Sequence, residues 1–158
     1  MSKLSRRNFI KSTALSAIFL SAVPQGIKSM TNTFWDDYDE VLCKKKFKLL
    51  VDGGVKTMSI GDAIAEVGKS FIDTDYVAGT LDKNMSESLV VNLTGLDCVT
   101  FVENCLVFAR CLKQGKTSFD DYKAELKKVR YRDGMIDGYA SRLHYFCDWI
   151  TDNENKGI

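Results

Sequence analysis

One cysteine of this chain lies where a turn is expected to become a helix. Cys98 follows a turn signal at Thr94 and Gly95, and then Asp97, a residue type that caps helices by accepting hydrogen bonds from first-turn N–H groups. In that first turn the helix dipole and the unpaired N–H groups favour a thiolate over a thiol. The thiolate is the nucleophilic form, so the position predicts a nucleophilic cysteine. The alternative is a small core residue on the apolar side of the helix.

A histidine and a carboxylate could complete a catalytic group. His144 is the one histidine of the sequence, and Asp148 follows it at i+4 on a helix expected from about residue 141 to 151. On a helix these two side chains can share a hydrogen bond. A thiol hydrolase needs a nucleophile, a base and a group that orients the base, and Cys98, His144 and Asp148 are one such set. The alternative is that His144 has a capping or packing role.

Three ordered motifs resemble those of a known family. Residues 97–103, with the sequence DCVTFVE, are similar to the nucleophile motif of the NlpC-type, papain-like peptidoglycan hydrolases, in particular the N-acetylmuramoyl-L-alanine amidase-like branch. Residues 75–81 resemble the tyrosine-containing segment that precedes the cysteine in such enzymes, and residues 139–150 resemble a motif of the amidase branch. The resemblance covers the chain from about residue 35 to its C-terminus.

The resemblance implies a reaction and roles for particular residues. Cys98 would attack the amide that joins the lactyl group of N-acetylmuramic acid to L-alanine. Tyr76 would offer its hydroxyl to the stem peptide, and Arg142 could bind a substrate carboxylate through two hydrogen bonds. The alternatives are that Tyr76 packs beside the helix of Cys98 and that Arg142 lies in water.

One part of the family pattern is missing from this sequence. The resemblance implies a base histidine on a β-strand well after the cysteine, in a Ser/Thr-His-x-Gly sequence that this chain lacks, and it places His144 in a substrate-side motif. We therefore expect an α+β fold that is the mainly helical N-terminal half of a papain-like NlpC-type domain, with the sheet-forming half truncated. Residues 30–158 would be a partial amidase-like cysteine hydrolase domain, weakly active or inactive. A non-catalytic muropeptide-binding remnant and a general papain-like cysteine peptidase remain open as alternatives.

Composition limits the class of protein and its partners. The 158 residues allow one domain, and 45% apolar residues suffice for a packed core. Without residues 1–29, which hold five basic residues and no acid, 17 basic and 21 acidic residues remain, a net charge of −4. Nucleic-acid binders present a basic surface, so we expect no nucleic-acid partner. The expected partners are peptidoglycan fragments, and a membrane only during export.

The cysteines do not form a metal-binding pattern. They include no Cys-x-x-Cys pair, and the chain has a single histidine, so we expect no metal, and we expect no other cofactor. Three of them share one predicted helix and cannot bridge each other without distortion. The five cysteines are Cys43, Cys98, Cys105, Cys111 and Cys147.

The N-terminal segment is typical of an export signal. Residues 1–29 combine a basic stretch around Arg6 and Arg7 with a short apolar run from Ala14 to Val23, too short to span a bilayer. The paired arginines followed by Phe9 match the twin-arginine export pattern, and an ordinary secretory signal is the alternative. Either signal predicts a periplasmic or cell-envelope protein.

Apolar spacing predicts five helices, and turn signals at residues 133–134 and 137–138 flank a candidate short strand. The first helix starts near Thr33 and ends at Gly53, and the second is capped by Ser59. The helix of Cys98 ends near Gly115, and the next one is capped by Ser118. A loop is expected over residues 73–84, a β-prone run over residues 88–93, and the fifth helix is that of His144.

The same spacing predicts which side chains face the core. The four sets, from the first, second, fourth and fifth helices, are Trp35, Tyr38, Leu42 and Leu49; Ile60, Ile64, Val67 and Phe71; Phe119, Tyr122, Leu126 and Val129; and Leu143, Phe146, Cys147 and Ile150. On the fourth helix, Lys123, Lys127, Lys128 and Arg130 are expected in solvent.

Overall fold

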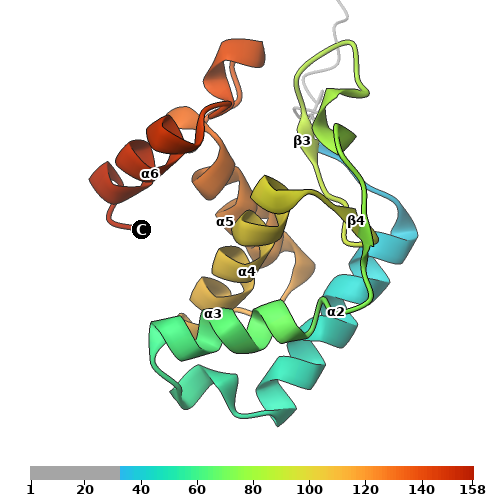
Figure 1. The fold of residues 1–158 in the computed structure, drawn as a ribbon, viewed down its shortest axis with the longest axis vertical. Helices are drawn as coiled ribbons and strands as arrows, with labels where there is room; N and C mark the ends of the chain where they lie inside the picture. The colour runs from blue at the N-terminus through green and yellow to red at the C-terminus, as the bar shows by residue number, and fades with distance from the viewer. Residues whose placement is uncertain (1–32) are drawn as a thin grey trace, which may run out of the picture. The chain divides into compact units, whose positions relative to one another are not determined.

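Five α-helices make up most of the structure, a computed structural model that describes residues 33–158 (Figure 1). They are α2 (Asp37–Asp52), α3 (Ile60–Lys69), α4 (Cys98–Lys113), α5 (Phe119–Arg130) and α6 (Phe146–Asn155). The strands of this part form two parallel pairs, β1 (Thr33–Phe34) with β3 (Leu89–Val90) and β2 (Asp75–Tyr76) with β4 (Gly95–Leu96). The prediction of an α+β, mainly helical fold is confirmed. The predicted leader, residues 1–29, lies outside the described residues.

The helix starts follow local capping. Asp97, Ser59 and Ser118 each precede a helix and accept a hydrogen bond from the N–H three residues later, as predicted. At α2 the cap is Asp36, which exchanges hydrogen bonds with Asp39 in a capping box. The first helix therefore begins at Asp37 rather than near Thr33, because Thr33 and the next residue pair with β3.

The buried face of α2 differs from the predicted one. Tyr38 and Leu49 are more than half exposed. A neighbouring set of residues faces inward, and one of them, Asp39, accepts a buried hydrogen bond of 2.8 Å from the Leu93 N–H through its carboxylate. That set is Asp39, Cys43, Phe47 and Leu50.

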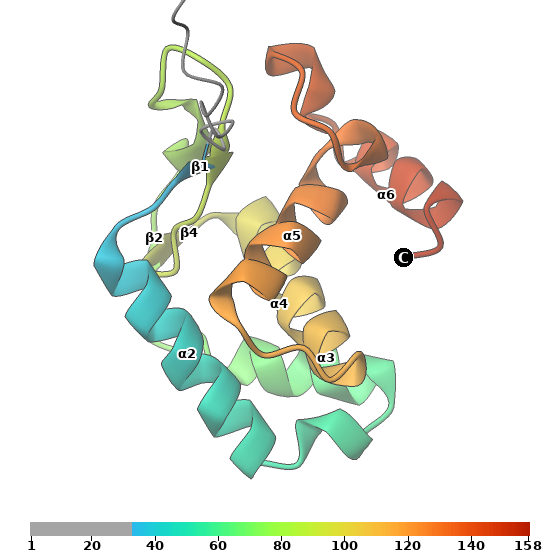
Figure 2. The ribbon, with the colours of Figure 1, turned by 180° about the vertical axis from the view of Figure 1, so that it is seen from behind.

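Helix α4 lies at the centre and packs against both α3 and α5 (Figures 1 and 2). Phe108 of α4 meets Phe47 of α2 and Tyr122 of α5, with ring centroids 4.8 and 4.9 Å apart. The predicted inward set of α5 is confirmed, since all four of its residues are buried. Of the predicted set on α3, Val67 and Phe71 are buried but Ile60 is exposed.

Arg130 on α5 corrects the prediction of a solvated residue. It is 2% exposed, and its Nη2 lies 2.8 Å from Glu103 Oε2 on α4. Its Nη1 also donates to the Val90 carbonyl of β3. A buried guanidinium needs such partners, because an unpaired buried charge is strongly unfavourable. Arg130 therefore joins two helices and a strand.

The last helix starts later than predicted. Residues 139–141 form a 3-10 turn and α6 begins at Phe146, so His144 precedes the helix. Residue Arg142 pairs with Tyr131 in an antiparallel bridge, and the Leu143 N–H donates to the Arg130 carbonyl at 3.0 Å. These bonds hold the segment extended and prevent a helix from residue 141.

The inward face of α6 is also different from the predicted one. Trp149 and Asn153 are buried, while Phe146, Cys147 and Ile150 are exposed. Within residues 33–158, no helix has the length and apolar character that a membrane crossing requires.

Candidate active site

Cys98 is exposed at the first position of α4. The Asp97 carboxylate accepts from the Thr100 N–H at 2.8 Å, and the Thr100 hydroxyl accepts from the Asp97 N–H at 2.9 Å. This capping box fixes the start of the helix. The N–H groups of Cys98 and Val99 have no acceptor within the helix, because an α-helix leaves its first N–H groups unpaired. The alternative of a core cysteine is therefore wrong for Cys98.

Strand pairing brings Tyr76 to the same place. Tyr76 pairs with Leu96, two residues before Cys98, and the Val77 N–H donates to the Leu96 carbonyl at 3.1 Å. Gly95 permits this approach, since a Cβ atom there would lie 2.6 Å from Val77 Cγ2, closer than real Cβ atoms come. The predicted loop over residues 73–84 thus contains a short strand that carries Tyr76.

Cys98 and Tyr76 line one pocket of about 310 Å³. Tyr76 is 73% exposed, so it does not pack into the core. Among the described residues, the lining has two carboxylates, Asp75 and Asp97, and no basic side chain. The full lining is Phe71, Thr74, Asp75, Tyr76, Leu96, Asp97, Cys98 and Phe101.

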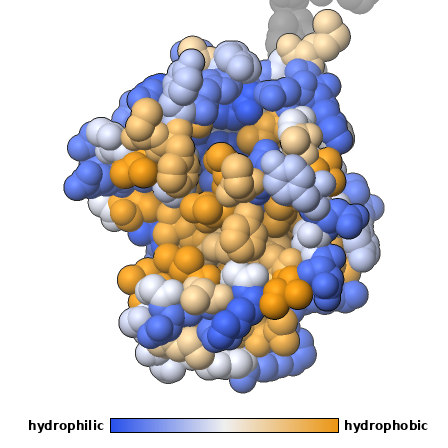
Figure 3. All heavy atoms as spheres, viewed as in Figure 1, coloured by the Kyte–Doolittle hydropathy of each residue, from blue (hydrophilic) through white to orange (hydrophobic). Residues whose placement is uncertain are grey.

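An apolar groove of about 550 Å³ adjoins this pocket and shares Phe101 with it. Side chains of α3 and α4 form most of the groove, and Trp149 of α6 contributes to it. Figure 3 shows a broad apolar area, in orange, over α3 and α4 in the middle of this face.

The predicted pair of His144 and Asp148 does not form. His144 Nε2 lies 2.8 Å from the Tyr139 carbonyl oxygen, and the His144 ring packs on the Tyr139 ring at 4.0 Å between centroids. The Asp148 carboxylate pairs with Arg132 at 3.1 Å. The i+4 spacing has no effect here, because His144 is outside the helix. His144 is not among the residues that line the Cys98 pocket.

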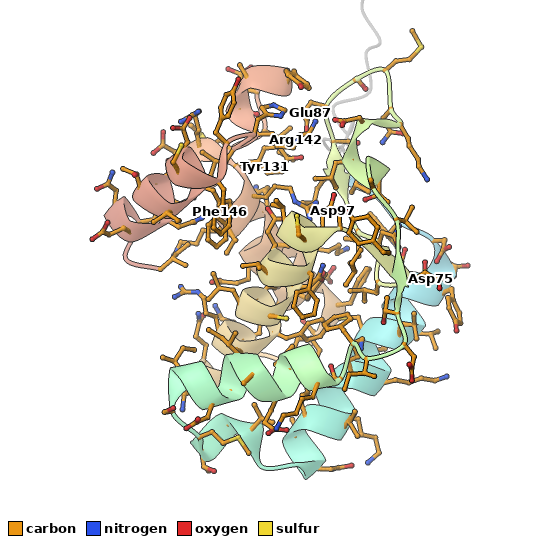
Figure 4. The ribbon with its side chains drawn as sticks, in the orientation of Figure 1. Asp75, Glu87, Asp97, Tyr131, Arg142 and Phe146 are labelled. Carbon is orange, nitrogen blue, oxygen red and sulfur yellow. The ribbon has the colours of Figure 1, made fainter. Side chains whose placement is uncertain are left out.

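Arg142 is buried, which contradicts the alternative that it lies in water. Its guanidinium pairs with Asp82, and its Nε lies 3.1 Å from Glu87 Oε1. The Tyr131 hydroxyl lies 2.8 Å from Glu87 Oε1, and burial raises the pKa of Tyr131, so it stays a donor. Figure 4 shows Glu87, Arg142 and Tyr131 close together toward the end of the molecule where Asp97 begins α4.

The sequence did not indicate that Arg142 would contact Glu87 and Tyr131, or that Arg130 would pair with Glu103. Glu87 stands in a polar stretch without periodicity, and Tyr131 follows the end of α5, so neither had a local signal. Glu103 belongs to the nucleophile motif but was given no role. Within residues 33–158, no group of three histidine, cysteine or acidic side chains could hold a metal ion.

The model of the AmiA-like family, described as N-acetylmuramoyl-L-alanine amidase-like, matches residues 66–158, which is more than half of the chain. The chain belongs to this family. All four predicted site residues, Tyr76, Cys98, Arg142 and His144, lie inside the segment that matches the AmiA-like model. No curated protein gave a match.

Solved structures support the assignment to the AmiA-like family. An N-acetylmuramoyl-L-alanine amidase from Bacteroides uniformis is 41% identical over 62% of this chain and 41% of its own, with a TM-score of 0.59. A proposed xylanase from Bacteroides fragilis is 47% identical over 57% of this chain and 39% of its own, with a TM-score of 0.54. A Legionella pneumophila protein is 25% identical over 77% of this chain and 38% of its own, with a TM-score of 0.62. The chain spans about two fifths of the length of these structures.

Proposed function

We propose that this protein is a cysteine-dependent amidase of the papain-like NlpC type, acting on the bond between N-acetylmuramic acid and L-alanine in muropeptides. The observation that carries the proposal is the exposed Cys98 at the start of α4, in a pocket that it shares with Tyr76. The amidase-like family and the Bacteroides uniformis relative support the substrate class.

The geometry around Cys98 suits acyl transfer. The thiolate adds to the amide carbonyl carbon, and the unpaired N–H groups of Cys98 and Val99 stabilise the oxyanion. Solvent water protonates the amine of L-alanine as it leaves, and a second water then hydrolyses the thioester to release the muramic acid carboxylate. The exposed hydroxyl of Tyr76 can bind the stem peptide beside the reacting bond.

Asp97 argues against glycosidase chemistry in the same pocket. Glycosidases require two carboxylates that flank the scissile bond. The two carboxylates here are Asp75 and Asp97, and Asp97 is committed to capping α4.

A second candidate is a muropeptide-binding protein without catalysis. The observation that favours it is the lining of the Cys98 pocket, which among the described residues contains no histidine to act as base. His144 is the one histidine of the chain, and its ring is held by Tyr139. We therefore expect slow hydrolysis if the protein is an amidase, and none if it only binds muropeptides. For either function we propose an exported protein, which is the location that residues 1–29 predict.

The experiment uses N-acetylmuramoyl-L-alanyl-D-isoglutamine with mass spectrometry of the products. An amidase releases N-acetylmuramic acid and L-alanyl-D-isoglutamine, whereas a peptidase would cut after L-alanine. Cys98→Ser should abolish release, and Cys147→Ser, the other exposed cysteine, should not. Binding without cleavage would favour the second candidate, and release that survives Cys98→Ser would contradict both the nucleophile and the mechanism.

A further inference from the structure

A second pocket, of about 490 Å³, lies around Arg142. Its polar groups are the carboxylates of Asp82 and Glu87, the guanidinium of Arg142 and the side chains of Asn84 and Ser86. Tyr139 also lines it and is 65% exposed. No step of the proposed reaction uses this pocket.

The charges of this pocket disfavour an anionic ligand. The Arg142 side chain is 8% exposed and pairs with both Glu87, whose side chain is 6% exposed, and Asp82, whose side chain is 60% exposed. One guanidinium and two carboxylates sum to a charge of −1, so the positive charge is already neutralised. A ligand carboxylate would meet two like charges and pay for displacing them. A neutral polar ligand suits the pocket better than the carboxylate first expected at Arg142.

The same groups are suited to hydroxyls. A hydroxyl donates one hydrogen bond and accepts others, so it can bind a carboxylate and a guanidinium together. Arg142 lines the pocket with the part of its guanidinium that remains exposed, while its Nε is buried 3.1 Å from Glu87 Oε1. Asp82 remains largely exposed as an acceptor, and Tyr139 offers an aromatic surface to the C–H side of a ring.

The pocket is tied to the helix that carries Cys98. Arg142 pairs with Tyr131 in a backbone bridge, and the Tyr131 hydroxyl holds Glu87. The preceding residue, Arg130, pairs with Glu103 on α4. A ligand held here would therefore keep a fixed position relative to the start of α4, which productive binding of a long substrate requires.

We propose that the Arg142 pocket is a saccharide subsite, which binds an N-acetylated amino sugar of the peptidoglycan fragment. The inference rests on the proposed function for its substrate class. It requires only binding, so it is tested without turnover.

The test measures binding to the full chain carrying Cys98→Ser, by two-dimensional NMR of backbone amides. The probes are N-acetylmuramoyl-L-alanyl-D-isoglutamine, N-acetylglucosamine, and L-alanyl-D-isoglutamine, which has no sugar. Both saccharide probes should shift the amides of Asp82 and Tyr139, and the dipeptide should not. Shifts of these amides by the dipeptide and not by the sugars, or shifts by none of the probes, would overturn the subsite.

Paired variants then test the individual groups. Asp82→Ala should weaken binding of the muramoyl dipeptide about tenfold, as expected for a lost hydrogen bond to a charged group. Asp137→Ala, an exposed aspartate outside the lining, is its control. Tyr139→Ala should weaken binding as well, and Tyr145→Ala, 71% exposed and outside the lining, should not.

The outcomes separate this inference from the proposed function. Saccharide binding lost in Asp82→Ala, with no hydrolysis by the unmodified chain, would support the subsite and contradict the amidase. Hydrolysis that depends on Cys98 would support the amidase. If the Kd for the muramoyl dipeptide were the same with and without Asp82→Ala, the subsite would be overturned. Circular dichroism confirms that each variant is folded.

Discussion

The five cysteines show how strongly the surroundings of a residue decide its chemistry. Cys98 and Cys147 are exposed, whereas Cys43, Cys105 and Cys111 are buried. Burial raises the pKa of Cys105 to about 11 and that of Cys111 to about 12, and it also raises the pKa of Cys43. A thiol reacts as the thiolate, so the buried cysteines are inert at neutral pH.

Alkylation should therefore divide the cysteines into two groups. With iodoacetamide at pH 7, we expect peptide mass spectrometry to find Cys98 and Cys147 modified, and the three buried cysteines modified only in denaturant. N-acetylmuramoyl-L-alanyl-D-isoglutamine should slow the modification of Cys98, because the ligand occupies its pocket, and should leave Cys147 unaffected. Equal protection of both, or of neither, would contradict a ligand site at Cys98.

The start of α4 is the element that sets the geometry of the site. Its position depends on the capping box between Asp97 and Thr100. Its attachment to α5 includes a buried ion pair between Glu103 and Arg130. The first interaction is local in the sequence and the second joins residues 27 positions apart, so they can be tested separately.

Loss of the cap should destabilise the first turn of α4. Asp97→Ala should lower the free energy of unfolding by about 1 kcal/mol, since the Thr100 N–H loses its acceptor. Hydrogen exchange should become faster at residues 98–102. Ser118→Ala removes the equivalent cap of α5 and is the control. It should have a similar effect on stability, and faster exchange at residues 98–102 in that variant would show that the effect is not local.

Loss of the buried arginine should have a larger effect. Arg130→Met leaves Glu103 buried without its partner and should lower the free energy of unfolding by about 3–5 kcal/mol in urea titrations. The double variant Glu103→Leu/Arg130→Met should recover most of that loss. Arg132→Met breaks the exposed pair with Asp148 and should change stability by less than about 1 kcal/mol. Equal losses for Arg130→Met and Arg132→Met would contradict the role assigned to the buried pair.

Several buried ionisable groups make the stability of the whole molecule depend on alkaline pH. A thiol with a raised folded-state pKa stabilises the fold below pH 9, its usual value, and this contribution is lost as the pH rises. Lys46 has the opposite sign. Burial lowers its pKa to about 8, so the fold gains stability as the pH rises from 8 toward 10.5. Burial also raises the pKa of Tyr122 and of Tyr131, so these two phenols add a loss above pH 10. Three thiols and two phenols oppose one amine, and the net effect is a loss.

We expect the free energy of unfolding to fall by roughly 3–5 kcal/mol between pH 8 and 10.5. The measurement is urea unfolding under reducing conditions, which prevents disulfide formation in the unfolded chain. Cys105→Ala should make the decline of stability with pH less steep, because it removes one of the three buried thiols. A stability that rises over this range would mean that Lys46 outweighs the thiols.

The sequence by itself determined the local features of this protein. The caps at Ser59, Asp97 and Ser118 were predictable because each uses hydrogen bonds within three residues. The place of Cys98 at the start of a helix follows from the same rule. The mainly helical α+β class and the amidase-like family were also readable from apolar spacing and from residues 97–103.

Only the tertiary structure decided which distant residues meet. Tyr76 reaches the Cys98 pocket through a parallel strand pair, and His144 is separated from Asp148 because backbone bonds of Arg142 delay the start of α6. Arg130 is buried because an acid on another helix neutralises it. Pairings of this kind depend on how helices pack against each other, and the spacing of residues along one helix carries no information about the partner that its side chains will meet.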